Sequence, residues 1–250
     1  MNLNLRNKFL LPTLGITILG LGVVIYFAAS SASDAMRTQI EAELEQVAEL
    51  SQAQINSWVV EVKKSVDSWS RAPVFQDVSQ IQRDPLKVNR LLGQYKENFG
   101  YYETLLVANE KGKIIASVDP SDIGKVDVSD RSYFRRTLSG GEALSPVIES
   151  RISGKPVFTV TKLVNGESEK AVIIGVVDLA SFSEQYIDPI RVGKTGYAYL
   201  IDKDGTMIAH PDKSKILTTN PVKEYDFGKN LLNGNNGLFT YEWEGDEKQV

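Results

Sequence analysis

The chain has 250 residues, a formal net charge of −4 at pH 7, one histidine and no cysteine. The absence of cysteine excludes disulfide bonds, zinc–thiolate sites and a thiol nucleophile. The acidic balance gives no basic field of the kind that nucleic acid requires, so nucleic acid is not expected as a partner.

The first element is an apolar segment long enough to cross a membrane. Residues 9–29 carry no charged side chain, and a helix of this length covers the hydrocarbon core of a bilayer, about 30 Å thick. Arg6 and Lys8 precede it, so residues 1–8 are expected to be cytoplasmic. The sequence thus predicts a single-pass protein of the inner (cytoplasmic) membrane, with a transmembrane helix at 9–30 and an extracytoplasmic (periplasmic) remainder.

A cleaved signal peptide is the alternative, because small residues follow the apolar segment at 28–33. The apolar run is longer than the 7–15 residues that are usual in signal peptides, which favours the membrane helix.

A long amphipathic helix is predicted over residues 33–72. This stretch contains no Gly or Pro, and its apolar residues recur at intervals of three or four. The helix is expected to end before Pro73, because the residue before a proline disfavours the α region. It either packs on its own domain, or forms a stalk that also pairs with a second copy of the chain, or does both. A shorter helix is predicted at 85–98.

Two β-hairpins of similar sequence follow. Strands at 104–108 and 113–117 flank a turn that contains Gly112, and strands at 197–201 and 206–210 flank a turn that contains Gly205. The two hairpins lie about 93 residues apart, which predicts two copies of one sheet module in tandem.

Further strands complete the predicted modules. Strands at 155–164 and 170–179 lie between the hairpins and are expected to make the first sheet antiparallel. A strand at 237–243 and a turn at 244–247 come near the end. Since another strand would start at the last residue and leave an exposed edge, the chain is expected to be a fragment of a longer protein.

Four segments resemble, in this order along the chain, motifs of the double Cache sensor domain of bacterial transmembrane receptors. Residues 130–134 (DRSYF) are similar to its D-R-x-Y/W-F/Y segment, and residues 153–157 (SGKPV) to its T/S-G-K-P strand entry. Residues 193–202 (GKTGYAYLID) are similar to the opening of its second module, and residues 208–211 (IAHP) to the I-A-H-P that follows. The resemblance covers nearly the whole chain from about Asp34.

The resemblance implies an α+β fold in which a transmembrane helix and a long stalk helix lead into two tandem PAS-like modules with antiparallel sheets. The membrane-distal, ligand-binding module is expected at 73–190, and the membrane-proximal module at 191–250, incomplete at its C-terminal end. Such a region binds a small polar solute, an amino acid or an organic acid, without a cofactor. It forms a homodimer and signals to a cytoplasmic module. The output is most often chemotaxis and less often a histidine kinase or a diguanylate cyclase.

The resemblance also implies a ligand site. In the family, an arginine and an aromatic residue of the first motif hold the ligand carboxylate, and Arg131, Tyr133 and Phe134 occupy those positions. Guanidinium suits this role because its planar fork donates two parallel hydrogen bonds to a carboxylate. Alternatively, Arg131 could pair on the surface with one of three acidic neighbours: Asp127, Asp130 or Glu149.

An acidic residue is expected to bind the ammonium group of an amino-acid ligand. Asp178, at the end of a later strand, would serve this role, although it could instead cap a helix that starts at Ser181. Tyr101, Tyr102 and Phe158 are candidates to line the pocket, although aromatic residues at the starts of strands are more often core.

The match to amino-acid-binding members has two departures. Val126 stands where those members carry a tyrosine five residues before the arginine, and the tyrosine expected near Ile148 or Glu149 is absent. The sequence therefore leaves the ligand open between an amino acid and another small carboxylate or polar solute.

No metal site and no catalytic site is expected. His210 is the only histidine, and no second metal ligand lies at a useful spacing from it. Asp202, Asp204 and Gly205 read as a hairpin turn, because the glutamate of a calcium loop is missing. The chain has no nucleophile elbow and no phosphate-binding loop, so it is predicted not to be an enzyme. A purely structural ectodomain is the alternative to a sensor.

Overall fold

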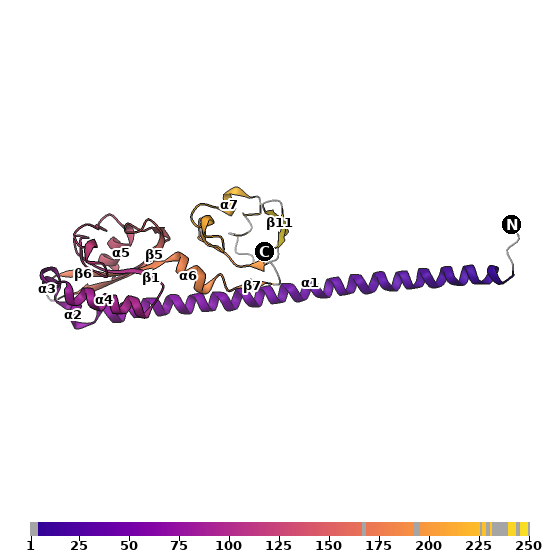
Figure 1. Ribbon diagram of the computed structural model, residues 1–250, viewed down its shortest axis with the longest axis horizontal. Coiled ribbons are helices and arrows are strands. Elements are labelled where there is room, and N and C mark those ends of the chain that lie inside the picture. The colour runs from indigo at the N-terminus through magenta and orange to yellow at the C-terminus, as the bar shows by residue number, and fades with distance from the viewer. Residues whose placement is uncertain are drawn as a thin grey trace. The chain divides into compact units, whose positions relative to one another are not determined.

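The computed structural model of the chain describes residues 5–166, 169–192, 196–225, 227–228, 231, 240–243 and 246–249. The chain divides into two compact units, Met1–Glu49 and Leu50–Val250. Helix α1 (Leu5–Ser70) begins in the first unit and ends in the second. Figure 1 labels the helices and strands.

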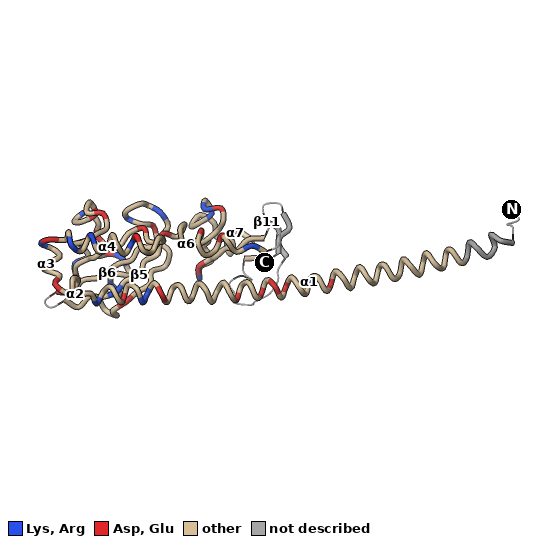
Figure 2. Tube along the Cα trace, turned by 60° about the horizontal axis from the view of Figure 1, so that its bottom comes forward, with Lys and Arg blue, Asp and Glu red and all other residues tan. Residues whose placement is uncertain are grey.

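In the first unit, the described residues belong to helix α1. Its apolar side chains from Leu14 to Phe27 are exposed, and an 18-residue window of the helix has a mean hydropathy of 1.9 with none of it buried. Residues 13–33 contain no charged side chain, and Figure 2 draws a long uninterrupted stretch of the helix without the colours of charged residues. Length and composition therefore agree with the membrane helix predicted at 9–30. An apolar segment near the N-terminus is also typical of the signal-peptide alternative.

In the second unit, the C-terminal part of α1 packs on its own domain. Trp58, Val62, Val66 and Trp69 are buried, and their spacing of four, four and three residues places them on one face of the helix. The helix ends at Ser70, before Pro73, as the sequence predicts.

Three helices connect α1 to the sheet: α2 (Pro73–Gln76), α3 (Val78–Arg83) and α4 (Leu86–Asn98). The side chain of Asp77 accepts a hydrogen bond from the backbone N–H of Gln80 at 2.8 Å, which satisfies a free amide at the start of α3. Helix α4 confirms the helix predicted at 85–98.

A six-stranded antiparallel sheet forms the centre of the second unit, in the spatial order β2-β1-β6-β5-β3, with β4 paired to β5. Its strands are β1 (Tyr102–Asn109), β2 (Ile114–Ser117), β3 (Glu142–Leu144), β4 (Ile148–Glu149), β5 (Pro156–Asn165) and β6 (Lys170–Asp178). The strands predicted at 155–164 and 170–179 correspond to β5 and β6. The predicted antiparallel arrangement is confirmed.

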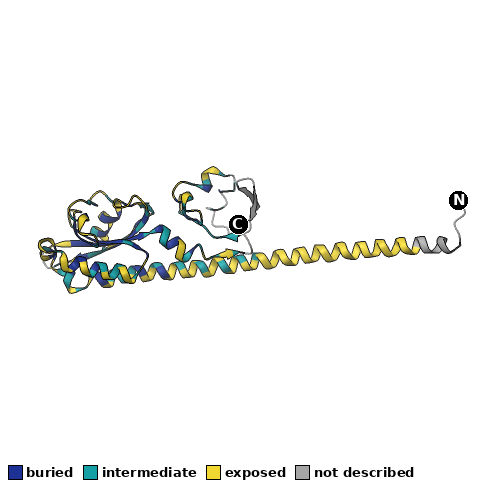
Figure 3. Cartoon of the chain, viewed as in Figure 1, coloured by how far each residue is buried: buried dark blue, intermediate teal, exposed yellow. Residues whose placement is uncertain are grey.

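The sheet is buried on both faces because its strands carry apolar residues at odd and even positions alike. Leu105 and Val107 face a core that includes Trp58 of α1 and residues of α6 (Leu179–Tyr186). Leu106 and Ala108 face a second core that includes residues of α5 (Ser132–Gly140). Figure 3 shows this sheet largely in the colour of buried residues. The two faces are called the α1 face and the α5 face below.

The second hairpin repeats the hydrogen bonds of the first one 93 residues later in the chain. Asn109 and Asp202 each accept hydrogen bonds from two backbone N–H groups of the turn. Gly112 and Gly205 have φ angles of +80° and +81°, and a Cβ on them would lie 2.5 and 2.4 Å from a neighbouring residue. Both positions therefore require glycine.

The repeat continues into the segment after each hairpin. The 3₁₀ helices η1 (Pro120–Asp122) and η2 (Lys213–Lys215) are each capped by an aspartate whose side chain accepts from the N–H two residues later. Gly124 and Leu217 follow, with φ angles of +76° and +62°, and each donates its N–H to the first residue of the preceding strand. Leu217 thus occupies a backbone position at which the first copy has a glycine.

The strands described within 191–250 are short and paired two by two. They are β7 (Arg191–Val192), β8 (Gly196–Tyr197), β9 (Leu200–Ile201), β10 (Met207–Ala209), β11 (Thr240–Trp243) and β12 (Asp246–Gln249), and a helix α7 (Pro221–Glu224) lies between β10 and β11. The strand predicted at 197–201 is thus shorter than expected. The strand predicted at 237–243 is described only from Thr240, and residues 244–245 of the predicted turn lie outside the described residues.

Candidate functional site

A pocket lies on the α5 face of the sheet, beside the start of α5 and the β4–β5 hairpin. Its polar lining consists of Arg131, Tyr133, Glu149, Ser150, Arg151 and Thr159, and its apolar lining of Leu106, Val126, Val128, Ile148, Ile152, Val157 and Val176. Its internal volume of about 20 Å³ has room for about one water molecule. Any larger ligand therefore requires the wall of the pocket to move.

Arg131 brings an unpaired donor into this pocket. It is the residue before helix α5, and its Nη2 donates to the backbone carbonyl of Glu149 at 3.0 Å. Its Nε is buried and has no hydrogen-bond partner among the described residues. A buried donor without a partner is destabilising, and a carboxylate that accepts from Nε and Nη would remove that penalty.

The two aspartates near Arg131 are paired with other cations. Asp127 Oδ2 lies 2.7 Å from Lys113 Nζ, and Asp130 Oδ2 lies 2.6 Å from Arg151 Nη2. The hydrogen bond from Lys113 holds the pKa of Asp127 well below its usual range, and the hydrogen bond from Arg151 lowers the pKa of Asp130. The surface ion pair considered for Arg131 is thus not formed with either aspartate.

Tyr133 and Phe134 are both buried on helix α5, but only Tyr133 lines the pocket. Burial raises the pKa of Tyr133 to about 12, so its hydroxyl is neutral at physiological pH and can donate a hydrogen bond. Phe134 is 2% exposed and belongs to the apolar core of the α5 face. The structure therefore brings Arg131 and Tyr133 together and places Phe134 in the core.

Thr159 is a pocket residue that the sequence analysis did not single out. It is 2% exposed, and its Oγ1 is buried without a hydrogen-bond partner among the described residues. Its backbone N–H donates to Ser145 Oγ at 2.8 Å, which fixes the strand locally. The available signal was a threonine flanked by Phe158 and Val160, two residues from Val157 and thus on the same face as Val157.

Arg151, also missed, fastens the wall of the pocket. It lies in the turn 150–155, which joins β4 to β5 and contains Gly154 at a φ of +74°. Its guanidinium binds the side chain of Asp130 and the backbone carbonyl of Asp127. These bonds connect the turn to the segment that leads into α5.

Tyr101 and Phe158 lie on the α1 face, away from Arg131. Their rings contact Trp58, with centroid distances of 5.1 and 5.9 Å. Phe158 stands between two pocket residues of β5, and successive side chains of a strand point to opposite faces. The expectation that these two aromatic residues line the pocket with Arg131 is therefore not met in this structure.

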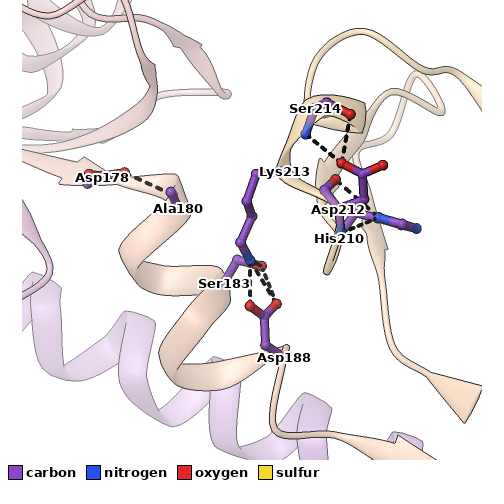
Figure 4. Close-up of polar contacts among 8 residues, drawn as sticks. All are labelled: Asp178, Ala180, Ser183, Asp188, His210, Asp212, Lys213 and Ser214. Atoms are coloured by element: carbon purple, nitrogen blue, oxygen red, sulfur yellow. Dashed lines mark hydrogen bonds and ion pairs between the residues drawn. The ribbon is translucent and has the colours of Figure 1, made fainter. Parts of the chain in front are cut away.

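Asp178 is the N-cap of helix α6. Its Oδ1 accepts a hydrogen bond from the N–H of Ala180 at 2.8 Å (Figure 4). It pairs with Val157 across the sheet, but it is not among the residues that line the pocket. The structure thus gives Asp178 the capping role that the sequence analysis weighed as its alternative.

The C-terminal end of α6 meets the second copy of the repeat. Lys213 Nζ lies 2.6 Å from Asp188 Oδ2 and 2.8 Å from Ser183 Oγ (Figure 4). His210 is buried nearby, and its Nδ1 accepts from the N–H of Asp212 at 2.9 Å. Among the described residues, no group of three or more His, Asp and Glu side chains could hold a metal ion.

Comparison with known proteins yields one family and several relatives. The Cache domain model, dCache_1, matches residues 32–250. The methyl-accepting chemotaxis protein PscA of Pseudomonas syringae pv. tomato is 24% identical over 224 residues, which are 86% of this chain and 34% of PscA. TlpB of Bacillus subtilis, also a methyl-accepting chemotaxis protein, is 24% identical over 95% of this chain and 35% of its own length. The chain thus spans about a third of these relatives.

Solved structures with a similar fold are sensor domains. The ligand-binding domain of the Pseudomonas fluorescens chemoreceptor CtaA, in complex with L-serine, has a TM-score of 0.65 at 16% identity, over 85% of this chain and 89% of that one. An extracellular domain assigned to the histidine kinase vpHK1S-Z8 has a TM-score of 0.63 at 15% identity, over 82% and 83% of the two chains. At this identity the likeness concerns the fold.

Proposed function

This chain belongs to the Cache domain family, and we propose that it is the ligand-sensing, extracytoplasmic region of a transmembrane chemoreceptor. Helix α1 would anchor the region in the cytoplasmic membrane, and a cytoplasmic signalling module would receive the signal. The methyl-accepting chemotaxis proteins among its relatives favour a chemotaxis output. The fold similarity to the kinase sensor domain supports a second candidate, in which the same sensor controls a kinase.

The observation that carries the ligand-binding proposal is the buried Nε of Arg131. It shares the pocket with the buried Oγ1 of Thr159, and neither atom has a hydrogen-bond partner among the described residues. Each unpaired buried polar atom destabilises the folded chain by about 1–3 kcal/mol, and here two of them line the same pocket. A ligand with acceptor oxygens would satisfy both.

The proposed ligand is a small molecule with a carboxylate group. A guanidinium matches a carboxylate with two parallel hydrogen bonds, and the neutral hydroxyl of Tyr133 adds a third donor to the pocket. Ligands named for similar folds include L-serine in CtaA and L-glutamine in PctB. For this chain they serve as candidates in a screen.

The proposal is tested by a thermal-shift screen of the whole chain in nanodiscs against amino acids, organic acids and amines. A ligand at 100 times its Kd is expected to stabilise the chain by about 2.7 kcal/mol, which is a clear shift in Tm. Arg131→Ala should abolish the shift, and Arg131→Lys should recover little of it, because lysine keeps the charge but loses the fork.

Arg135→Ala is the matched control, since Arg135 is exposed on the same helix and donates to the backbone carbonyl of Asp130. Shifts that Arg131→Ala leaves intact, or a complete absence of shifts, would contradict direct sensing through this pocket and favour a structural ectodomain.

A further inference from the structure

We infer that the pocket selects a small aliphatic carboxylate that carries no ammonium group, rather than an amino acid. The inference rests on the proposed function, because it concerns the same pocket. It follows from which charged side chains line the pocket and from the ion pairs and hydrogen bonds that each of them forms.

The ionic groups that line the pocket are mainly cationic. They are the guanidinium groups of Arg131 and Arg151 and the carboxylate of Glu149. Arg151 is neutralised by Asp130, and the side chain of Glu149 is exposed to solvent. Among the charged side chains that line the pocket, Arg131 is therefore the one that places a buried, unpaired donor nitrogen in it, and its positive charge attracts a carboxylate and repels an ammonium group.

The other acidic residues of this region do not supply a counterion for an ammonium group. Asp127 forms an ion pair with Lys113. One carboxylate oxygen of Asp178 accepts a hydrogen bond from the N–H of Ala180, and Asp178 does not line the pocket. The carboxylate oxygens of Glu103 are buried without a partner among the described residues, but Glu103 does not line the pocket either. The one carboxylate that lines the pocket, that of Glu149, is exposed to solvent, so an ammonium group that enters would lose its water without gaining a buried carboxylate, which is unfavourable.

The rest of the lining suits a hydrocarbon chain. Seven residues present aliphatic side chains to the pocket: Leu106, Val126, Val128, Ile148, Ile152, Val157 and Val176. The uncharged polar residues of the lining are Tyr133, Ser150 and Thr159, and two of them, Tyr133 and Thr159, offer buried hydroxyl groups. They can bind the carboxylate or a hydroxyl on the neighbouring carbon.

The test compares three ligands with the same carbon skeleton: propionate, L-lactate and L-alanine. They differ only in the group on the second carbon, which is hydrogen, hydroxyl or ammonium. Titration calorimetry on the whole chain in nanodiscs should show propionate or L-lactate binding at least about tenfold more tightly than L-alanine. Tighter binding of L-alanine than of both acids would overturn the inference.

Two variants sharpen the test. Asp178→Asn keeps the N-cap of α6, since asparagine caps helices as well as aspartate, but removes the charge. It should leave all three affinities within about twofold, whereas a loss confined to L-alanine would show that Asp178 reads an ammonium group. Val126→Asp adds a carboxylate to the wall and should reduce the preference for the acids over L-alanine by about tenfold or more. An unchanged preference would count against the charge argument.

The thermal-shift screen against amino acids, organic acids and amines distinguishes failure of this inference from failure of the proposed function. If an amino acid shifts the Tm in an Arg131-dependent manner and the acids do not, the inference is wrong and the sensor proposal stands. If no compound produces an Arg131-dependent shift, both are wrong.

Discussion

At the scale of single residues, the pocket is characterised by two buried polar atoms. Arg131 Nε and Thr159 Oγ1 have no hydrogen-bond partner among the described residues, whereas Thr161, two residues along β5, donates its hydroxyl to the carbonyl of Ala143. A buried hydroxyl that is bonded stabilises a fold, and one that is not bonded destabilises it. The contrast between the two threonines can be measured.

Thr159→Val is expected to stabilise the ligand-free chain by about 1 kcal/mol, because valine has the same shape and removes an unpaired hydroxyl. Thr161→Val should destabilise the chain by about 1 kcal/mol, because its hydroxyl is bonded. Denaturant unfolding measures both changes, and ligand titration should show weaker binding for Thr159→Val only. Equal destabilisation by the two substitutions would mean that Thr159 is satisfied in the free protein.

Leu217→Gly is expected to raise the free energy of unfolding by about 0.5–1 kcal/mol. Leu217 has a φ of +62°, which strains a side chain with a Cβ, and it is 36% exposed, so little burial is lost. Gly124→Ala, at the equivalent position of the first copy, should destabilise by about 1 kcal/mol through φ alone, because its Cβ would meet nothing within 4 Å. Thermal unfolding of both variants checks this, and a destabilised Leu217→Gly would argue against backbone strain.

At the scale of elements, the pocket is the place where a turn, a helix start and a sheet meet. Arg151 connects the turn 150–155 to the segment before α5, while Asp178 caps α6 at the end of β6. Helix α6 in turn reaches the second copy of the repeat through Asp188 and Lys213. Besides the apolar cores, a few polar contacts thus connect the elements around the pocket, and the strength of the ion pairs among them depends on ionisation.

The contact between Arg151 and Asp130 is expected to make stability depend on pH. Arg151 lowers the folded-state pKa of Asp130, so the contact stabilises the chain above about pH 4 and is lost as the pH falls through the lowered folded-state value. Arg151→Gln should therefore lower the Tm at pH 7, and the difference from wild type should shrink towards about pH 3.

Arg135→Gln is the control for this measurement, because Arg135 bonds the backbone carbonyl of Asp130 and not its carboxylate. Its effect on the Tm should not change with pH. A difference between wild type and Arg151→Gln that is equally large at pH 7 and at about pH 3 would contradict the assignment.

At the scale of the whole molecule, local sequence patterns predicted the helices and strands. Which side chains line the pocket depends instead on how these helices and strands pack together. The hairpins, the end of α1 before Pro73 and the position of Arg131 follow from residues close in sequence. The side of the sheet on which Tyr101 and Phe158 lie does not follow from nearby residues, because it depends on which helix covers each side of the sheet. In β1 the register also shifts between Tyr102 and Thr104. The pocket position of Thr159 likewise depends on the packing of α5 against its face of the sheet.

Pairing of two copies along α1 belongs to the proposed receptor and can be tested because the chain has no cysteine. Met36 and Ile40 expose 65% and 45% of their surface on one face of the helix, where they could contact a second copy. Met36→Cys is expected to form disulfide-linked dimers in membranes, whereas Thr38→Cys, on the opposite face, should form few. Non-reducing electrophoresis measures the dimers, and equal yields from both variants would contradict a specific pair.

The most direct test of the central claim is an NMR titration of the arginine side-chain Nε–H signals. The chain, labelled with ¹⁵N-arginine in detergent micelles, is titrated with L-lactate or with a carboxylate found in the screen, and Arg131→Lys assigns the signal of Arg131. The account predicts that this signal moves strongly downfield on saturation, because the buried Nε gains a charged acceptor, while the signal of Arg135 stays in place. Binding that leaves the Arg131 signal unmoved would contradict the account.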